Sequence, residues 1–328
     1  MQLKDFINKL TLENELNYYI YNDSNHLTLP LSVRLEFKFE DKIFESWGVS
    51  QNKDLAFFKA LMELIERVVL SKSCSLHFKK SFFSKTQSLN EIATKHCVPC
   101  ELLYPDNSNG AGMGTSASMA KQSALMELIE RHTILSCLYL NIPPKQIEKV
   151  PREISLGLDG HRLSFHYWIC GKYFVVLAVD QLPNGGFLFT HSCSANVSTA
   201  ILKSYEEMIP NIIYYEKHPE EHLEVQGITY NDIMSFNRYW KYSGDKDVLS
   251  FLMNKHSCKQ EGEVPTLKNI YYSSLEVPKS LKFQKGLFCY RAISPEAQQL
   301  FFDNWSLRYI NPKLRGKGTI PSFPHIIS

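Results

Sequence analysis

Glutamate and arginine residues recur in an eight-residue motif that the chain contains twice. The segment ALMELIER occupies residues 60–67 and again residues 124–131. In each copy two glutamates stand three positions apart and an arginine follows, so the three side chains share one face of a helix. Carboxylates brought together bind hard cations such as Mg²⁺, and without a cation they raise one another's pKa. An adjacent arginine binds phosphate or holds a carboxylate in place. The motif therefore predicts a magnesium and phosphate site.

A glycine-rich turn precedes the second copy of the motif. Residues 109–115 read NGAGMGT, with glycine at every second position. Such a turn lets the backbone approach a ligand closely, and the N-terminus of the helix that follows favours an anion. The turn matches neither the P-loop nor the dinucleotide-binding pattern, so by itself it is equally an ordinary turn. Followed by the glutamate and arginine motif, it indicates a nucleotide-phosphate site.

The alternative to a metal site is a surface ion pair between the glutamate and the arginine four positions on. Such a pair stabilises a helix by about a few tenths of a kcal/mol. It tolerates Asp, Lys or Gln, and nothing in helix formation requires the same eight letters twice. The similarity also extends upstream to a glycine and an alanine, and a weaker third copy spans residues 200–207. We therefore expect an internally duplicated domain with an active site between its copies.

The elements that position these motifs form an α+β pattern. Apolar periodicity predicts helices at residues 2–22, 53–72, 115–138, 198–216, 229–257 and 295–304. The third has Thr115 or Ser116 as its N-cap, and Pro210 disturbs the fourth. Alternation predicts a strand pair within residues 31–47, a hairpin of residues 163–179 with 186–192, and strands at 268–273 and 284–293. We divide the chain into an N-terminal helix and strand region, residues 1–44, and a single domain, residues 45–328.

Composition excludes several classes of protein. The 328 residues carry a net charge of +2, so neither nucleic acid nor a membrane surface is an expected partner. No apolar stretch is long enough to span a bilayer, and the N-terminus has no signal-peptide core. Eight cysteines without a secretion signal predict reduced thiols and a cytoplasmic protein. Cys97 and Cys100 form the only CxxC, which supplies half of the ligands of a structural zinc site.

The glycine turn and the motif after it resemble the YcaO family, whose pattern is an N-G-x-A-x-G turn followed by A-x3-A-L-x-E-x2-E-R. The resemblance covers roughly residues 45–328. It implies interlocked subdomains with mixed and antiparallel sheets, and three related glutamate-bearing helices around a nucleotide. It also implies ATP- and Mg²⁺-dependent activation of peptide backbone amides, in which the amide oxygen attacks the γ-phosphate. An internal Cys, Ser or Thr then gives a thiazoline or oxazoline in a ribosomally made peptide, whereas a sulfur donor gives a thioamide.

The resemblance assigns roles to individual residues. The positions that hold Mg²⁺ in the family are Glu63, Glu66, Glu127, Glu130 and Glu207. The positions expected to contact the nucleotide are Arg131, which binds phosphate, Lys203, where an arginine is usual, Ser123, Thr115, Gly112 and Arg34. The C-terminal region with Pro321 and Pro324 corresponds to the end that supports catalysis in azoline-forming relatives. Thr115, Met119 and Pro210 replace a usual Asn, Glu and Gln, and His325–Ser328 extend beyond the usual terminal proline.

The partners follow from the same resemblance. The chain has no room for a fused docking domain, so it is expected to act on a precursor peptide with separate proteins, as a homodimer or a hetero-complex. These proteins are a ubiquitin-activating-like partner that binds the leader peptide and, for azole products, a flavin dehydrogenase. Two alternatives stay open: a thioamide-forming enzyme, and a degenerate nucleotide-binding scaffold or regulatory subunit. Met119, Lys203 and Pro210 favour the scaffold, and the intact glutamate set argues against it.

Overall fold

A computed structural model describes most of the chain, and its helices and antiparallel sheets confirm the predicted α+β class. The residues described are 5, 7–8, 15–21, 30–72, 77–80, 86–104, 109–150, 154, 162–217, 246–253, 264–282, 286–300 and 306–321. Contacts divide the chain into two units that interleave along the sequence. The first unit consists of Met1–Cys97, Asp106–Leu128 and Asn269–Pro295, and the second of Val98–Pro105, Ile129–Lys268 and Glu296–Ser328. A single domain over residues 45–328 stays a prediction.

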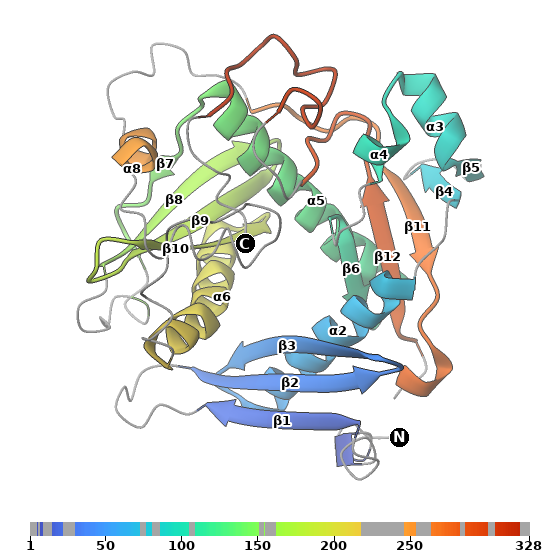
Figure 1. Ribbon diagram of the computed structural model, residues 1–328, viewed down its shortest axis with the longest axis vertical. Coiled ribbons are helices and arrows are strands. Elements are labelled where there is room, and N and C mark those ends of the chain that lie inside the picture. Colours follow the sequence, from blue (N-terminus) through green and yellow to red (C-terminus); the bar gives the residue numbers. More distant parts are fainter. Residues whose placement is uncertain are drawn as a thin grey trace. The chain divides into compact units, whose positions relative to one another are not determined.

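The first unit begins with an antiparallel sheet in the order β1-β2-β3, followed by helix α2 (Figure 1). The elements are β1 (Leu16–Tyr21), β2 (Leu31–Phe39), β3 (Lys42–Ser50) and α2 (Lys53–Lys72). The turn between β2 and β3 contains Glu40, which has a φ of 55°. The predicted strand pair within residues 31–47 and the predicted helix at 53–72 are both confirmed.

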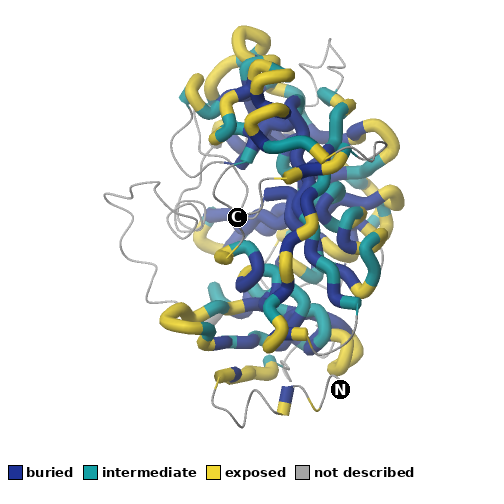
Figure 2. The backbone as a smooth tube through the Cα atoms, turned by 90° about the vertical axis from the view of Figure 1, so that its right-hand side faces the viewer, coloured by how far each residue is buried: buried dark blue, intermediate teal, exposed yellow. Residues whose placement is uncertain are grey.

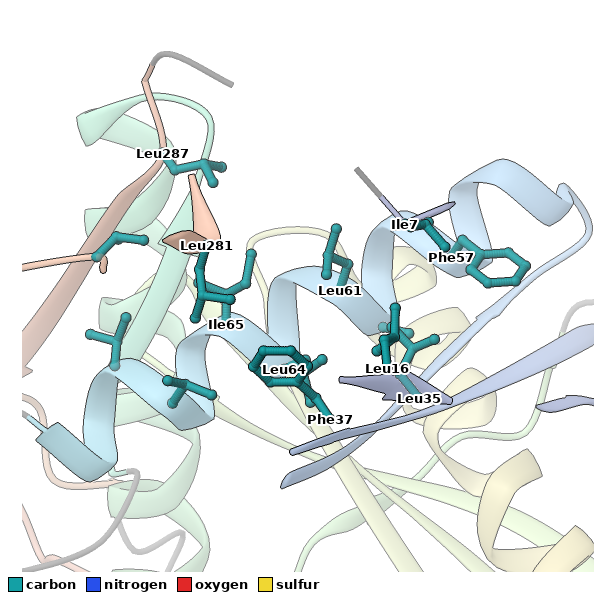
Figure 3. Close-up of a cluster of buried hydrophobic side chains, with 14 of the residues drawn as sticks. Ile7, Leu16, Leu35, Phe37, Phe57, Leu61, Leu64, Ile65, Leu281 and Leu287 are labelled. Atoms are coloured by element: carbon teal, nitrogen blue, oxygen red, sulfur yellow. The ribbon is translucent and has the colours of Figure 1, made fainter. Parts of the chain in front are cut away.

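Helix α2 carries the first motif and is fixed by a buried cluster on its apolar side. Phe57, Leu61, Leu64 and Ile65 follow the spacing of one helix face, and all are buried. Side chains from the sheet and from the loops after β11 pack against them; Figure 3 shows Leu16, Leu35, Phe37, Leu281 and Leu287 in this cluster. The apolar face therefore sets the rotation of α2, which determines where its glutamates point.

A second sheet of the first unit has the order β5-β4-β11-β12-β6 and joins segments far apart in sequence. Its strands are β4 (His77–Lys80), β5 (Thr86–Ser88), β6 (Ala111–Gly114), β11 (Tyr271–Leu275) and β12 (Phe288–Ile293). The strands predicted at residues 268–273 and 284–293 are thus present with shifted bounds. Helix α3 (Leu89–His96) begins in a capping box between Ser88 and Glu91, and the short 3-10 helix η2 is Lys279–Leu281.

The second unit contains an antiparallel sheet in the order β10-β9-β8-β7, against which helix α6 packs. Its elements are α4 (Cys100–Leu103), β7 (Lys145–Gln146), β8 (Arg162–Cys170), β9 (Tyr173–Gln181), β10 (Phe187–Ser194), α6 (Val197–Lys217) and α8 (Lys246–Met253). Helix α5 (Ala117–Leu140) contributes residues to both units. Figure 2 marks the buried and exposed residues along the backbone, and strand β10 is buried along its whole length. The helices predicted at 115–138 and 198–216 are confirmed, and α6 continues through Pro210.

Three sequence-based predictions of elements are wrong. Asp5, Ile7 and Asn8 are helical as predicted for residues 2–22, but Leu16–Tyr21 is strand β1, because its backbone pairs with β2 and Leu16 packs in the buried cluster. Residues 163–179 form two strands, since the chain turns at Gly171, whose φ is +60°. Residues 295–300 are irregular, because their backbone groups form hydrogen bonds with side chains and not with one another. The His132 ring accepts the Gln298 N–H, and the Asn311 amide donates to the Ala297 carbonyl. Of the helices predicted at 229–257 and 295–304, residues outside 246–253 and residues 301–304 lie outside the described part.

Six cysteines lie in the described ranges, and none of these six forms a disulfide. Four of them are buried: Cys137, Cys170, Cys193 and Cys289. No helix in the described ranges is long and apolar enough to cross a membrane.

Candidate functional site

Two strand–helix pairs, β3–α2 and β6–α5, carry the duplicated motifs on the same local geometry. A Cβ atom on Gly48 would lie 2.0 Å from the Ala56 carbonyl oxygen and 2.5 Å from the Ala60 nitrogen. A Cβ atom on Gly112 would lie 2.6 Å from the Ala120 carbonyl oxygen and 2.2 Å from the Ala124 nitrogen. These glycines therefore let each strand touch the backbone of the following helix. The sequence predicted that the glycine turn lets the backbone approach a ligand. At Gly112, the backbone instead lies close to the backbone of α5.

The pair β10–α6 has the same arrangement with polar residues in place of glycine. The Ser192 hydroxyl donates to the Ala200 carbonyl, and Thr190 donates to the Ser204 carbonyl over 2.6 Å. Ser46 makes the matching bond to the Ala60 carbonyl over 2.7 Å in β3–α2. The helix N-termini are also alike, because side-chain oxygens of Asn52, Ser116 and Asn196 each accept the backbone N–H three residues on. The weak third copy in the sequence thus has the local structure of the other two.

In the first motif, two half-buried carboxylates lie close together. Glu63 accepts the Trp47 backbone N–H over 3.2 Å and pairs with Arg67 over 2.6 Å. Glu66 accepts the backbone N–H of Met113 in β6. Burial, and then the nearby Glu63 carboxylate, raise the pKa of Glu66 to about 7. Without a ligand, this pair is an electrostatically costly arrangement.

The third glutamate of the first unit that was predicted to bind Mg²⁺ is Glu127 on α5. Burial raises the pKa of the Cys289 thiol, and the carboxylates of Glu66 and Glu127 raise it further, so both lie near that thiol in β12. Within the described ranges, no three acidic, histidine or cysteine side chains are close enough together to hold a metal ion. A common metal site for all five glutamates therefore stays a prediction.

In the second motif, the corresponding carboxylate lies among basic groups. Glu130 Oε1 lies 2.8 Å from Nδ1 of His191 and 4.0 Å from Nε of Arg131. Burial favours the protonated acid, but His191, Arg131 and Lys203 outweigh it and lower the pKa of Glu130. Sequence reasoning missed His191, because it lies on strand β10, 61 residues away, with no motif around it. Glu130 is thus held as a carboxylate, whereas Glu66 is pushed toward its neutral form.

The remaining predicted site residues lie at several places. Lys203 and Glu207 are exposed on α6, Thr115 is exposed before α5, and Ser123 is half-buried against Gly112. Arg34 lies on the face of β2 opposite the buried cluster, where it pairs with Glu36 and Glu45. Pro321 is half-buried at the end of a segment whose Thr319 N–H donates to the Tyr139 carbonyl, and Pro324 lies outside the described residues.

His132 follows Arg131 but has a structural role. Its Nε2 lies 2.8 Å from the Pro265 carbonyl oxygen and must donate, while its Nδ1 accepts the Gln298 N–H over 2.9 Å. The side chain is fully buried, and burial lowers the pKa of His132 to about 4. A proton on Nδ1 would remove the acceptor of the Gln298 N–H, so the ring is a neutral connector between segments of the second unit.

This buried histidine predicts a loss of stability in acid. The unfolded chain binds a proton near the ordinary pKa of about 6.5, which the folded His132 does not bind until about pH 4. Stability is therefore complete above about pH 6.5 and falls as the pH drops toward 4, by at most about 3 kcal/mol for this residue. Urea unfolding of wild type and His132→Asn between pH 4.5 and 7.5 measures the effect. An equal pH slope in both proteins would contradict it.

The chain matches a protein-family model. The model described as YcaO cyclodehydratase, ATP- and Mg²⁺-binding, matches residues 91–274, which is more than half of the chain. The chain belongs to the YcaO family. Its cofactors are accordingly ATP and Mg²⁺. The chemistry of the residues is compatible with both groups: in the first unit Glu63 and Glu66 offer the carboxylate oxygens that Mg²⁺ prefers, and in the second unit Arg131 and Lys203 carry positive charge beside Glu130.

Solved structures of YcaO proteins share the fold at low sequence identity. YcaO from Methanopyrus kandleri, bound with AMPPCP and Mg²⁺, is 14% identical with a TM-score of 0.56, and the match covers 99% of this chain and 96% of that one. A chain of the E. coli microcin synthetase McbBCD complex is 13% identical with a TM-score of 0.58, covering 94% and 96%.

A heterocyclase in complex with substrate and cofactor has a TM-score of 0.65 at 11% identity. That match covers 94% of this chain but only 56% of the heterocyclase, so this chain spans little more than half of its length. The comparison with curated protein sequences finds no match. The structural likeness therefore establishes the fold of the YcaO family for this chain.

Proposed function

We propose that this YcaO protein uses ATP and Mg²⁺ to activate peptide backbone amides, and so cyclises Cys, Ser or Thr to thiazoline or oxazoline in a ribosomally made peptide. One observation carries the proposal. The two copies of the same motif have opposite electrostatic surroundings: a carboxylate pair at Glu63 and Glu66, and basic groups around Glu130. Phosphoryl transfer needs both, since a metal ion and fixed positive charges neutralise the phosphates.

The chain's residues then have the following roles. The carboxylates of Glu63, Glu66, Glu127, Glu130 and Glu207 hold Mg²⁺, and Arg131 and Lys203 bind phosphate. The contacts to the rest of the nucleotide come from Gly112, Thr115, Ser123 and Arg34. When bound, ATP supplies the phosphoryl group that turns the amide oxygen into a leaving group. The C-terminal region with Pro321 and Pro324 supports the reaction at the amide; its described part is anchored on α5 through Tyr139.

The reaction requires other proteins. We propose a precursor peptide as substrate, a ubiquitin-activating-like partner that holds its leader and, for azole products, a flavin dehydrogenase. The solved structures support a multi-protein arrangement, because E. coli microcin synthetase is a McbBCD complex that has also been solved with pro-MccB17 bound. This chain would act in the cytoplasm as a homodimer or within such a complex.

The test is ATP turnover by the purified full-length chain, with and without candidate partner and precursor, followed by mass spectrometry of the peptide. Loss of one water per ring supports the proposal, provided that it disappears in Glu127→Gln. Exchange of oxygen for sulfur identifies a thioamide-forming enzyme instead. Binding of ATP with no turnover under any combination identifies a scaffold, the alternative that Met119, Lys203 and Pro210 favour.

A further inference from the structure

His191 connects the two functional residues of the second motif. It lies on strand β10, and its side chain is only 5% exposed, against 12% for Glu130 and 13% for Arg131. Its Nδ1 lies 2.8 Å from Glu130 Oε1, and its Nε2 lies 3.5 Å from an Arg131 terminal nitrogen. One buried ring therefore touches both the carboxylate and the guanidinium of residues that are adjacent in sequence.

The two contacts give each ring nitrogen a separate role. A carboxylate oxygen accepts, so Nδ1 donates to Glu130, and a guanidinium donates, so Nε2 can serve Arg131 only as an acceptor. One ring can therefore hold both partners at once.

We propose that His191 is a positioning residue for both ligands, one that orients the Glu130 carboxylate toward Mg²⁺ and the Arg131 guanidinium toward phosphate. The bond from Nδ1 to Oε1 sets the orientation of the Glu130 carboxylate, and the contact of Nε2 with a terminal nitrogen sets the plane of the Arg131 guanidinium. Outer-shell hydrogen bonds of this kind commonly change metal affinity by about 10- to 100-fold. The inference rests on the proposed function, since it takes Glu130 as a metal ligand and Arg131 as a phosphate ligand.

Two substitutions separate the two bonds. The amide nitrogen of His191→Asn lies where Nδ1 was and can still donate to Glu130, but nothing replaces Nε2. The side-chain oxygen of His191→Gln reaches the Nε2 position and can still accept from Arg131, but nothing replaces Nδ1. His191→Ala loses both bonds. The three variants therefore form a matched set at one position.

The experiment measures equilibrium binding with the full-length chain, without peptide or turnover. Mg²⁺ is titrated at fixed ATP, and ATP is titrated at saturating Mg²⁺; thermal unfolding of each variant checks the fold. We expect His191→Gln to weaken Mg²⁺ about 10-fold with little change for ATP, His191→Asn to do the reverse, and His191→Ala to weaken both.

The outcomes are distinguishable. If wild type does not bind ATP with Mg²⁺, the proposed function fails and the inference fails with it. If wild type binds both but the Asn and Gln variants behave alike, or lower only the unfolding temperature, His191 is structural and the inference alone is overturned. A reciprocal pattern in properly folded variants supports it, because a purely structural residue would not separate metal from nucleotide.

Discussion

Gly112→Ala is expected to destabilise the protein by at least about 3 kcal/mol, or to prevent folding, because its new methyl group has no space. The Cβ atom would stand 2.2 Å from the Ala124 nitrogen and 2.8 Å from Cβ of Ser123. Both atoms belong to α5 near the second motif, and the nitrogen is backbone, so the strand must move away from the helix. Gly48→Ala should act in the same way against Ala56 in α2. Denaturant unfolding followed by circular dichroism measures both variants.

Glycines in open turns provide the matched controls. Gly171 and Gly185 have positive φ values of +60° and +87°, and a Cβ atom at either would meet nothing within 4 Å. Asn tolerates this region of the backbone, so Gly171→Asn and Gly185→Asn should cost about 1 kcal/mol or less. If Gly112→Ala were as stable as these controls, the close approach of β6 to α5 would be wrong.

The sequence predicts best those elements whose signals are local. The apolar face of residues 53–72 was long and periodic, and helix α2 has those bounds. The strand pair within residues 31–47 alternates around a polar turn, and β2 and β3 pair there. The repeat predicted related helices, because eight identical letters leave the same apolar face to bury. Each of these signals requires no knowledge of distant parts of the chain.

The sequence fails where distant residues decide the structure. Residues 295–300 are compatible with a helix, but His132 and Asn311 take up backbone groups that a helix would use. Leu16–Tyr21 pairs with β2, which lies further along the chain, so the prediction of a helix over residues 2–22 missed this strand. His191 is the clearest case within the candidate site, since nothing near it in sequence connects it with Glu130.

Identical motifs also acquire different electrostatics from the strands beside them. Glu66 accepts a backbone N–H of β6 and is repelled by the Glu63 carboxylate. Glu130 accepts a hydrogen bond from His191 of β10 and is attracted by Arg131 and Lys203. No local pattern could distinguish the two glutamates, because their eight-residue surroundings are the same letters. The difference arises from tertiary structure, and it makes the two residues respond in opposite ways to the same substitution.

Glu66→Gln is expected to lower the rate of Mg²⁺-dependent ATP turnover by about 100-fold or more, yet to stabilise the ligand-free protein. The folded pKa of Glu66 is about 7, above its ordinary value of 4.5. Its contribution to stability is therefore present at low pH and is lost as the pH rises through about 7, which costs up to about 3 kcal/mol at pH 8. A neutral amide avoids this cost, so the variant should unfold at higher denaturant concentration than wild type at pH 8, and the difference should shrink by pH 5.

Glu130→Gln is the matched control, because it should lose turnover but change stability in the opposite direction. The pKa of Glu130 is lowered in the folded protein, so its carboxylate contributes stability above the ordinary pKa and loses it in acid. At pH 8 the amide leaves His191, Arg131 and Lys203 without their negative partner, and the variant should be less stable than wild type by about 1–3 kcal/mol. Unfolding curves of both variants at pH 5 and pH 8 in the absence of Mg²⁺ decide the matter. Shifts of the same sign at pH 8 would show that the two copies do not differ as the structure indicates.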